Sequence, residues 1–179
     1  MRLKEYYKKQ VLPKMKEEMG IKNEMAVPRM EKVTLNVGLG PGMKEPKYKE
    51  QVEATLAAIT GQKAVLTKAR KSISSFKIRE GMEIGAKVTL RGDRMYDFVE
   101  KLINIVFPRV RDFRGIEVKK VDKDGNISVG IKETLAFPEI SPEEIELNHP
   151  LEITITTTAN SREEGRALFE KLGFPFKNK

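Results

Sequence analysis

Cationic side chains are concentrated in residues 68–95 of the chain, and few acidic side chains lie among them. The eight cations are Lys68, Arg70, Lys71, Lys77, Arg79, Lys87, Arg91 and Arg94, and the three acids are Glu80, Glu83 and Asp93. Residues 68–77 hold no acid at all, but three serine hydroxyls lie between the cations. Such a mixture of ammonium, guanidinium and hydroxyl donors suits phosphate and ribose groups. The alternative is a solubilising basic loop, although solvated faces of this chain, such as residues 162–171, mix acids with bases.

The composition of the chain also favours an anionic partner. A net charge of +8 on 179 residues attracts polyanions, and nucleic acid is the leading class ahead of a membrane surface. One compact domain, residues 1–179, is the simplest organisation for this length and for 39% hydrophobic residues. The absence of Cys and the single His149 argue against disulfides and zinc. No apolar run is long enough to span a bilayer, so we expect a cytoplasmic protein that does not contact membranes.

Two predicted strands carry polar residues on one face. In residues 30–40, Lys32, Thr34 and Asn36 alternate with apolar residues, and in residues 84–91 Lys87, Thr89 and Arg91 do the same. If the two strands are neighbours, they form one surface rich in hydrogen-bond donors. Because this face offers no Phe or Tyr for base stacking, RNA would be contacted through phosphates, 2′-hydroxyls and shape. The alternative is that these are ordinary solvent-facing side chains.

Helices and further strands surround these two strands. Apolar spacing predicts helices over residues 3–20, with a kink at Pro13, over residues 48–61, and over residues 95–106, capped by Asp93. Capping-box patterns start helices at Ser141 and Ser161. The strands are expected at residues 64–67, 126–131 and 151–158.

The order of these elements in residues 30–131 predicts an α+β fold. It would be an antiparallel sheet with helices packed on one face, a split βαβ (ferredoxin-like or RRM-like) core with N- and C-terminal additions. One sheet face would stay free for a partner.

Three motifs that could carry other chemistry fail when their spacing is checked. The glycines of residues 38–42 lack the third glycine and the acidic partner of a dinucleotide loop. Residues 122–133 resemble a calcium loop but lack glycine at the sharp turn. His149 has no marked nucleophile beside it in the sequence. We therefore expect no cofactor, no metal and no catalytic residue.

The sequences TGQKAVLTKARKSISSFKIREGMEIGAKVTLRGDRM, FPRVRDFRGI and RALFEKLGFPF resemble the bacterial large-subunit ribosomal protein L five family. The resemblance covers almost all of the chain and implies a similar fold. It implies a non-enzymatic protein, monomeric within the ribosome, that binds 5S ribosomal RNA and large-subunit ribosomal RNA in the central protuberance. It also implies contact with peptidyl-site transfer RNA. The competing class is an RNA-processing or RNA-modifying enzyme, which would need a catalytic constellation.

The same resemblance assigns residues to partners. It implies that Asn36, Gln62, Thr89 and Arg91 face 5S ribosomal RNA. The strand faces and the basic segment extend this set by Lys32, Thr34, Lys63, Lys68, Arg70 and Lys71. The expected transfer RNA contacts are Lys77, Arg79, Gly81 and Met82. Secondary candidates for an intersubunit contact with small-subunit ribosomal protein S thirteen are Arg109, Arg111 and Arg114.

The transfer RNA contacts would lie on a hairpin in residues 77–84. Its turn is expected at Glu80 and Gly81, so that this turn forms the projecting tip and Met82 is exposed beside it. The alternatives are that Met82 packs back onto Ile73 or Ile84, and that Arg111 pairs with Asp112 instead of reaching another protein.

Overall fold

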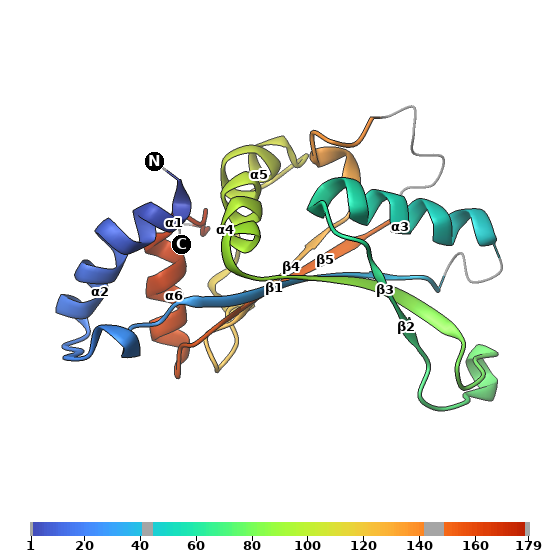
Figure 1. Ribbon diagram of the computed structural model, residues 1–179, viewed down its shortest axis with the longest axis horizontal. Helices are drawn as coiled ribbons and strands as arrows, with labels where there is room; N and C mark the ends of the chain where they lie inside the picture. Colours follow the sequence, from blue (N-terminus) through green and yellow to red (C-terminus); the bar gives the residue numbers. More distant parts are fainter. Residues whose placement is uncertain (1, 41–44, 142–148, 178–179) are drawn as a thin grey trace. The chain divides into compact units, whose positions relative to one another are not determined.

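The computed structural model describes residues 2–40, 45–141 and 149–177 (Figure 1). Contacts divide the chain into two compact units. The first unit comprises Met1–Val33, Leu90–Val129 and Ile153–Lys179, and the second comprises Thr34–Thr89 and Gly130–Glu152. Because both units are built from separated segments, each depends on contacts between distant parts of the sequence. The expectation of a single domain over residues 1–179 stays a prediction.

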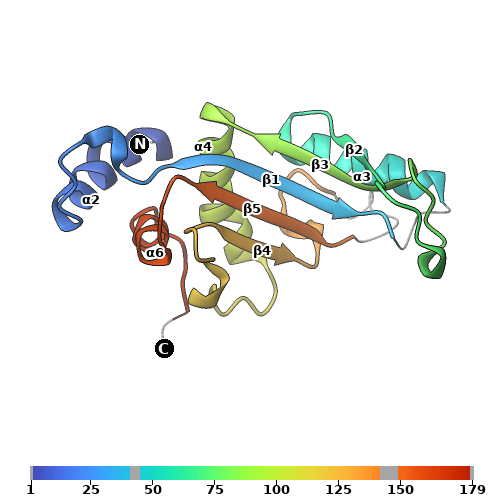
Figure 2. The same cartoon turned by 90° about the horizontal axis from the view of Figure 1, so that it is seen from below.

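Five strands form one sheet in the order β2-β3-β1-β5-β4. They are β1 (Met30–Gly38), β2 (Val65–Lys68), β3 (Glu83–Leu90), β4 (Ile127–Ile131) and β5 (Leu151–Thr157). Figure 2 shows that the arrows of β1, β5 and β4 alternate in direction, as in an antiparallel sheet. The buried side chains Val33, Leu35 and Val37 alternate with half-buried polar ones along β1. The predicted α+β class with its split βαβ core is confirmed.

One long helix covers the strands of the second unit. Helix α3 (Pro46–Thr60) buries Tyr48, Val52, Leu56 and Ile59, which recur at helical spacing. It ends at Gly61, whose φ of 66° is the left-handed conformation that glycine adopts without strain. Short 3-10 turns, η3 (Ser74–Phe76) and η6 (Thr134–Ala136), complete this unit.

The N-terminal helix of the first unit changes its hydrogen-bond register before a proline. Helix α1 (Leu3–Tyr6) runs into a π-helical turn, η1 (Tyr7–Val11), and then into α2 (Leu12–Glu18). Pro13 lies in the first turn of α2, directly after the π-helical turn in which the hydrogen-bond register changes. The backbone stays helical from α1 through α2, so Pro13 does not divide the helix, and the predicted kink stays a prediction. A short 3-10 turn, η2 (Glu24–Ala26), leads into β1.

The central helix of the first unit begins one residue earlier than its predicted cap. Helix α4 (Gly92–Lys101) continues through η4 (Leu102–Val106) into α5 (Phe107–Arg109). Its N-cap is Arg91, so the prediction that Asp93 caps the helix is wrong. Asp93 lies in the first turn, where the helix dipole favours a carboxylate, and it pairs with Lys4 of α1.

The C-terminal helix of the first unit, α6 (Arg162–Lys171), has the predicted Ser161 cap, but the Glu164 side chain bonds one residue before the N-cap instead of completing the capping box. The Ser161 hydroxyl accepts from the Glu164 backbone N–H at 3.3 Å, and the Glu164 carboxylate accepts from Asn160 N–H at 2.9 Å. A 3-10 turn, η5 (Val118–Lys120), precedes the 122–126 turn. The second predicted capping box, after Ser141, falls on residues 142–148, outside the described residues.

Helix α6 meets the 122–126 turn through two glycines. A Cβ added to Gly165 would lie 2.4 Å from both Cα and O of Gly125, which is closer than real Cβ atoms approach. A Cβ on Gly125, whose φ is 76°, would lie 2.6 Å from the Ala159 Cβ. The helix therefore packs backbone against backbone, and only glycine permits that distance.

We expect Gly165→Ala to lower the free energy of unfolding by roughly 1–3 kcal/mol, because overpacking outweighs the helix propensity that alanine gains. Urea unfolding followed by circular dichroism measures the change. Gly130→Ala is the matched control, since a Cβ at Gly130 meets no heavy atom within 4 Å. An unchanged midpoint for Gly165→Ala would contradict the close packing.

Asp122 organises the same turn. Its carboxylate accepts from the backbone N–H of Asp124 at 3.0 Å, and from the backbone N–H and side-chain amide of Asn126 at 2.7 and 3.0 Å. Partial burial acts to raise the pKa of Asp122, but these hydrogen bonds outweigh it, and the pKa lies below its ordinary value. The Asn126 side chain in turn accepts from Thr157 N–H at 2.9 Å, at the end of β5.

Asp122→Ala should lower the free energy of unfolding by about 1 kcal/mol at pH 7, because the turn loses the hydrogen bonds that the carboxylate accepts. The carboxylate is largely exposed to water, which keeps this loss small. A depressed pKa stabilises the folded state above the unfolded pKa of about 3.9 and ceases to do so as the pH falls through the lower folded value. The difference between wild type and variant should therefore shrink below about pH 4. Thermal unfolding from pH 7 to pH 3 tests this, and a difference independent of pH would contradict it.

Candidate nucleic-acid interface

Polar side chains from three strands of the second unit converge around Gly85. The pairing of β2 with β3 places Thr67 opposite Gly85 and Val65 opposite Lys87. A Cβ on Gly85 would lie 2.7 Å from the Thr67 hydroxyl oxygen and 3.9 Å from the Asn36 side-chain oxygen. Thr67 therefore occupies the space that a side chain at Gly85 would need. This arrangement brings β2 into the predicted surface of β1 and β3.

The other predicted residues of the second unit lie along the same strands. Thr34 and Asn36 of β1 and Thr89 of β3 are half-buried, and Lys87 is exposed. The Gln62 side-chain amide donates to the Thr89 carbonyl oxygen at 3.4 Å. Gln62 and Thr89 are therefore neighbours, as the predicted RNA-facing set requires.

Thr67 and Gly85 were missed from the sequence. The short strand β2 shows only one exposed apolar residue, Val65, and no alternation that would have marked Thr67 as part of this face. The pairing register between β2 and β3 is the signal that identifies both residues, and that register exists only in the folded chain.

Lys32 and Arg91 belong to the first unit. Lys32 is half-buried, and Arg91 is exposed and lies 3.3 Å from the Glu31 carboxylate. Both partners of this ion pair are open to water, so the pair contributes little stability and leaves the guanidinium available to another anion.

Two of the three acidic residues in residues 68–95 pair with cations from outside that segment. Within the second unit, Glu83 forms an ion pair with Lys49 of α3, and this hydrogen bond raises the pKa of Lys49. Within the first unit, Asp93 pairs with Lys4, whose ammonium lowers the pKa of Asp93. These acids therefore do not neutralise the cations of their own segment. Lys68, Arg70 and Lys71 of this segment are exposed, and so is Lys63 before it.

The hairpin after β2 has its apex at a different position from the predicted one. Ile73 and Ile78 exchange backbone hydrogen bonds of 2.8 and 3.1 Å, and the 3-10 turn Ser74–Phe76 with Lys77 closes the loop between them. The Glu80 and Gly81 turn is instead held against the end of β2. Gly81 N–H donates to the Ala69 carbonyl at 2.9 Å, and Ala69 N–H donates to the Met82 carbonyl at 2.8 Å. The prediction that Glu80 and Gly81 form the tip is wrong.

The side chains of the hairpin differ correspondingly from expectation. Met82 is half-buried and its sulfur accepts from Arg79 N–H at 3.1 Å, so Met82 is not the exposed apolar residue of the loop. Phe76, at the apex, is 71% exposed. Sequence analysis missed Phe76, although an aromatic residue inside an acid-free cationic run is a signal for nucleic-acid contact. Lys77 and Arg79 are exposed, as expected.

The three arginines at the end of α5 and after it lie on the surface of the first unit. Arg109, Arg111 and Arg114 are exposed, and Phe113 between them stacks on the buried Phe107 with ring centroids 5.1 Å apart. In the part of the chain that the structure describes, neither Arg111 nor Asp112 forms an ion pair, so the predicted alternative of an Arg111–Asp112 pair is wrong.

We also looked for a metal site, a membrane-spanning helix and a catalytic histidine in residues 2–40, 45–141 and 149–177. No group of three or more His, Cys, Asp or Glu side chains there could hold a metal ion. No helix in those ranges has the length and apolar character needed to cross a membrane. His149 is 1% exposed and meets Tyr48 edge to face at 6.1 Å, so it is part of the core of the second unit.

Comparison with known proteins agrees with this arrangement. Residues 23–79 match the family model described as ribosomal protein L5, and residues 83–176 match the model of the C-terminus of the same ribosomal protein family. The chain is 51% identical over 175 residues to the large ribosomal subunit protein uL5 of Carboxydothermus hydrogenoformans, and the match covers 98% of both chains. The chain thus belongs to the L5 family of large-subunit ribosomal proteins.

Proposed function

We propose that the polar surface of β1, β2 and β3 in the second unit binds 5S ribosomal RNA. The observation that carries this proposal is the convergence of Thr67 and Asn36 around Gly85, with Lys87 on the same face. Hydroxyl, amide and ammonium groups on a twisted strand surface fit the phosphates and 2′-hydroxyls of an RNA minor groove. Because the Thr67 hydroxyl fills the space beside Gly85, it adds a hydrogen-bonding group at the centre of this surface.

The residues of this surface have different roles. Lys87 and the exposed cations Lys63, Lys68, Arg70 and Lys71 would supply most of the affinity by displacing counterions from phosphates. Asn36, Gln62 and Thr89 would fix the register by directional hydrogen bonds. In the first unit, Lys32 and Arg91 are candidates for further contacts with 5S ribosomal RNA. Arg109, Arg111 and Arg114 are candidates for contact with small-subunit ribosomal protein S thirteen.

The hairpin of residues 73–78 is the proposed contact with transfer RNA in the peptidyl site. Phe76 at its apex offers an exposed ring that can stack on a base, and Lys77 and Arg79 beside it can contact phosphates. Gly81 and Met82, anchored to the end of β2, would support the hairpin instead of forming its tip.

Membership of the L5 family settles two broader expectations. The family consists of structural ribosomal proteins, so the chain is a constituent of the large subunit and not an RNA-processing or RNA-modifying enzyme. A ribosomal component is cytoplasmic in bacteria, which confirms the predicted location. We propose in addition that the chain acts as a monomer within the ribosome.

Substitutions on the sheet should separate phosphate contacts from directional ones. Lys87→Ala should reduce the steepness of the salt dependence of 5S RNA binding, the slope of log K against log salt, by about one unit. Asn36→Ala should weaken binding by roughly 1–2 kcal/mol while leaving that slope unchanged, because it removes a neutral hydrogen bond.

Filter binding of 5S RNA at several salt concentrations measures both quantities. Lys119→Ala, an exposed lysine of the first unit, is the matched control and should bind like wild type. If Lys87→Ala and Lys119→Ala have the same effect, the sheet face does not bind 5S RNA.

Shortening the apex should separate transfer RNA contact from 5S RNA binding. Replacing residues 74–77 by Asn-Gly keeps the antiparallel Ile73 and Ile78 pair, because a two-residue turn fits between paired strands. This variant and Phe76→Ala should each lower retention of transfer RNA in the peptidyl site of reconstituted ribosomes. For Phe76→Ala we expect a loss of about 1–3 kcal/mol, the usual contribution of one stacked base.

The affinity for 5S RNA should stay at the wild-type value in both hairpin variants. Ile105→Ala removes another exposed apolar side chain, 42% exposed, and should leave transfer RNA retention unchanged. Unaltered transfer RNA occupancy in the shortened variant would refute the assignment of the apex.

A further inference from the structure

A cavity of about 570 Å³ lies within the first unit, between the N-terminal helices, the start of β1 and α4. This volume falls in the range of about 300–1,000 Å³ that small-molecule sites occupy. Met30 of β1 and Met95 of α4 form an apolar part of its wall, and the rings of Tyr7 and Tyr96 lie beside them, 6.2 Å apart and inclined by 39°. Methionines and aromatic rings are adaptable surfaces for a flat ligand.

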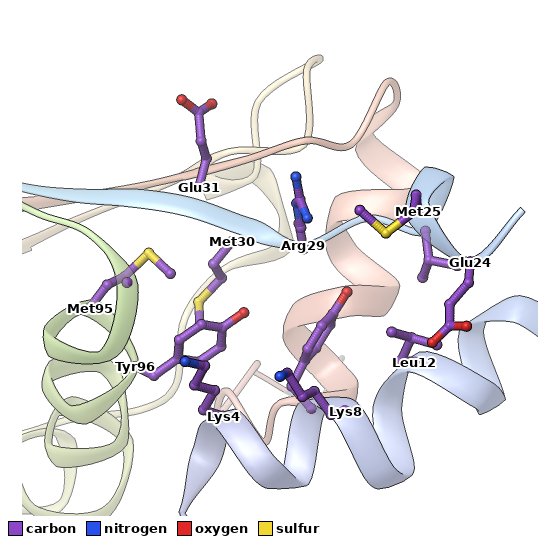
Figure 3. Close-up of a pocket in the computed structure, with 13 residues that line it drawn as sticks. Lys4, Lys8, Leu12, Glu24, Met25, Arg29, Met30, Glu31, Met95 and Tyr96 are labelled. Atoms are coloured by element: carbon purple, nitrogen blue, oxygen red, sulfur yellow. The ribbon is translucent and has the colours of Figure 1, made fainter.

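Tyr96 is a buried polar side chain in this wall. The residue is 8% exposed, and its hydroxyl makes no hydrogen bond to another described residue, but it is not among the buried unpaired side-chain atoms, so solvent reaches it. The neighbouring Tyr7 is different, because its hydroxyl donates to the Pro28 carbonyl at 3.0 Å. Figure 3 shows Tyr96 reaching from α4 toward the N-terminal helix that carries Lys4 and Lys8. A ligand that bonds to this hydroxyl replaces its bond to water and gains a directional contact at the wall of the cavity.

Three cations, Lys4, Lys8 and Arg29, and two acids, Glu24 and Glu31, line the cavity, which leaves an excess of one positive charge. Lys4 pairs with Asp93, and the rim residue Glu31 pairs with Arg91. Lys8 and Arg29 also line the cavity, and neither forms an ion pair within the described part of the chain. Lys4 chiefly lowers the pKa of Asp93, and Lys8 and Arg2 lower it further, so these cations lie near one another at this end of the unit.

The surroundings of the cavity add to this positive charge. Residues 1–22 contain seven Lys and Arg against three Glu, which is half of the net charge of +8 on the chain. Gly92, the first residue of the ten-residue helix α4, also lines the cavity, so the positive end of the α4 dipole faces it. Asp93 already lies at this helix terminus and pairs with Lys4, so an anionic group at the rim would meet chiefly Lys8 and Arg29.

We propose that this cavity binds a single unpaired nucleotide of an RNA strand. The phosphate lies at the rim by Lys8 and Arg29, and the base enters between the tyrosine rings and the methionines. There the Tyr96 hydroxyl hydrogen-bonds to a base edge. An apolar peptide would not use the cationic rim, and an isolated phosphate would not use the rings. The site is distinct from the sheet surface of the second unit and gives the protein an additional RNA contact.

Methionine methyl groups report on the cavity directly. In full-length protein labelled with ¹³C at the methionine methyls, titration with AMP, GMP, CMP and UMP should shift Met30 and Met95 in a saturable way with at least one nucleotide. Met15, which is fully buried in the same unit but does not line the cavity, is the internal control and should not shift. Inorganic phosphate at the same ionic strength is the control: if it shifts the same methyl signals equally, the cavity binds an adventitious ion only.

Two variants test the proposed contacts. Tyr96→Phe removes only the hydroxyl and should weaken nucleotide binding about three- to tenfold. Lys8→Ala should also weaken it, whereas Lys14→Ala, an exposed lysine of the same helical segment that does not line the cavity, should bind like wild type.

The proposal is overturned by any of three results. They are the absence of shifts at Met30 and Met95 with all four nucleotides, equal shifts with phosphate alone, and wild-type affinity in Tyr96→Phe. The titrations contain no 5S RNA, so their outcome is independent of the function proposed for the sheet surface.

Discussion

The antiparallel register between β2 and β3 is the constraint on which the candidate interface depends. It places Thr67 opposite Gly85, and the missing side chain at Gly85 lets Thr67 approach Asn36 of β1. A shift of one residue would turn every side chain of β2 to the opposite face, so the surface exists only in this register. The same alternation keeps Val33, Leu35 and Val37 buried on the other side. Core packing and the polar surface are thus fixed by one pairing.

Electrostatics depends on where the acidic residues find partners. Glu83 pairs with Lys49 and Asp93 pairs with Lys4, so each acid contacts a cation from outside its own segment. The cations of residues 68–79 are left exposed to solvent and to anions. Surface ion pairs of this kind contribute little stability, but they determine which positive charges stay available to a polyanion. The net charge of +8 is therefore concentrated on particular surfaces instead of being spread evenly.

Backbone hydrogen bonds distinguish a supporting turn from a projecting one in the hairpin. Both turns contain a residue with positive φ, Lys77 at 55° and Gly81 at 83°. Gly81 is bonded to Ala69, whereas Ser74–Phe76 lies beyond the Ile73 and Ile78 pair and bonds only within its own loop. The projecting turn is therefore the one that carries the exposed aromatic ring, and the glycine turn connects it to the sheet.

The sequence by itself determined the elements whose signals are local. Period-two alternation identified β1 and β3, helical spacing with Gly61 identified α3, and the Ser161 cap identified α6, because each signal arises within a few turns of chain. The predicted face of Asn36 and Thr89 followed from the same alternation. Only the tertiary structure decided that Thr67 joins that face, that Asp93 pairs with Lys4 instead of capping α4, and that Phe76 forms the apex. These features depend on strand register and on partners distant in sequence, and no local pattern encodes such contacts.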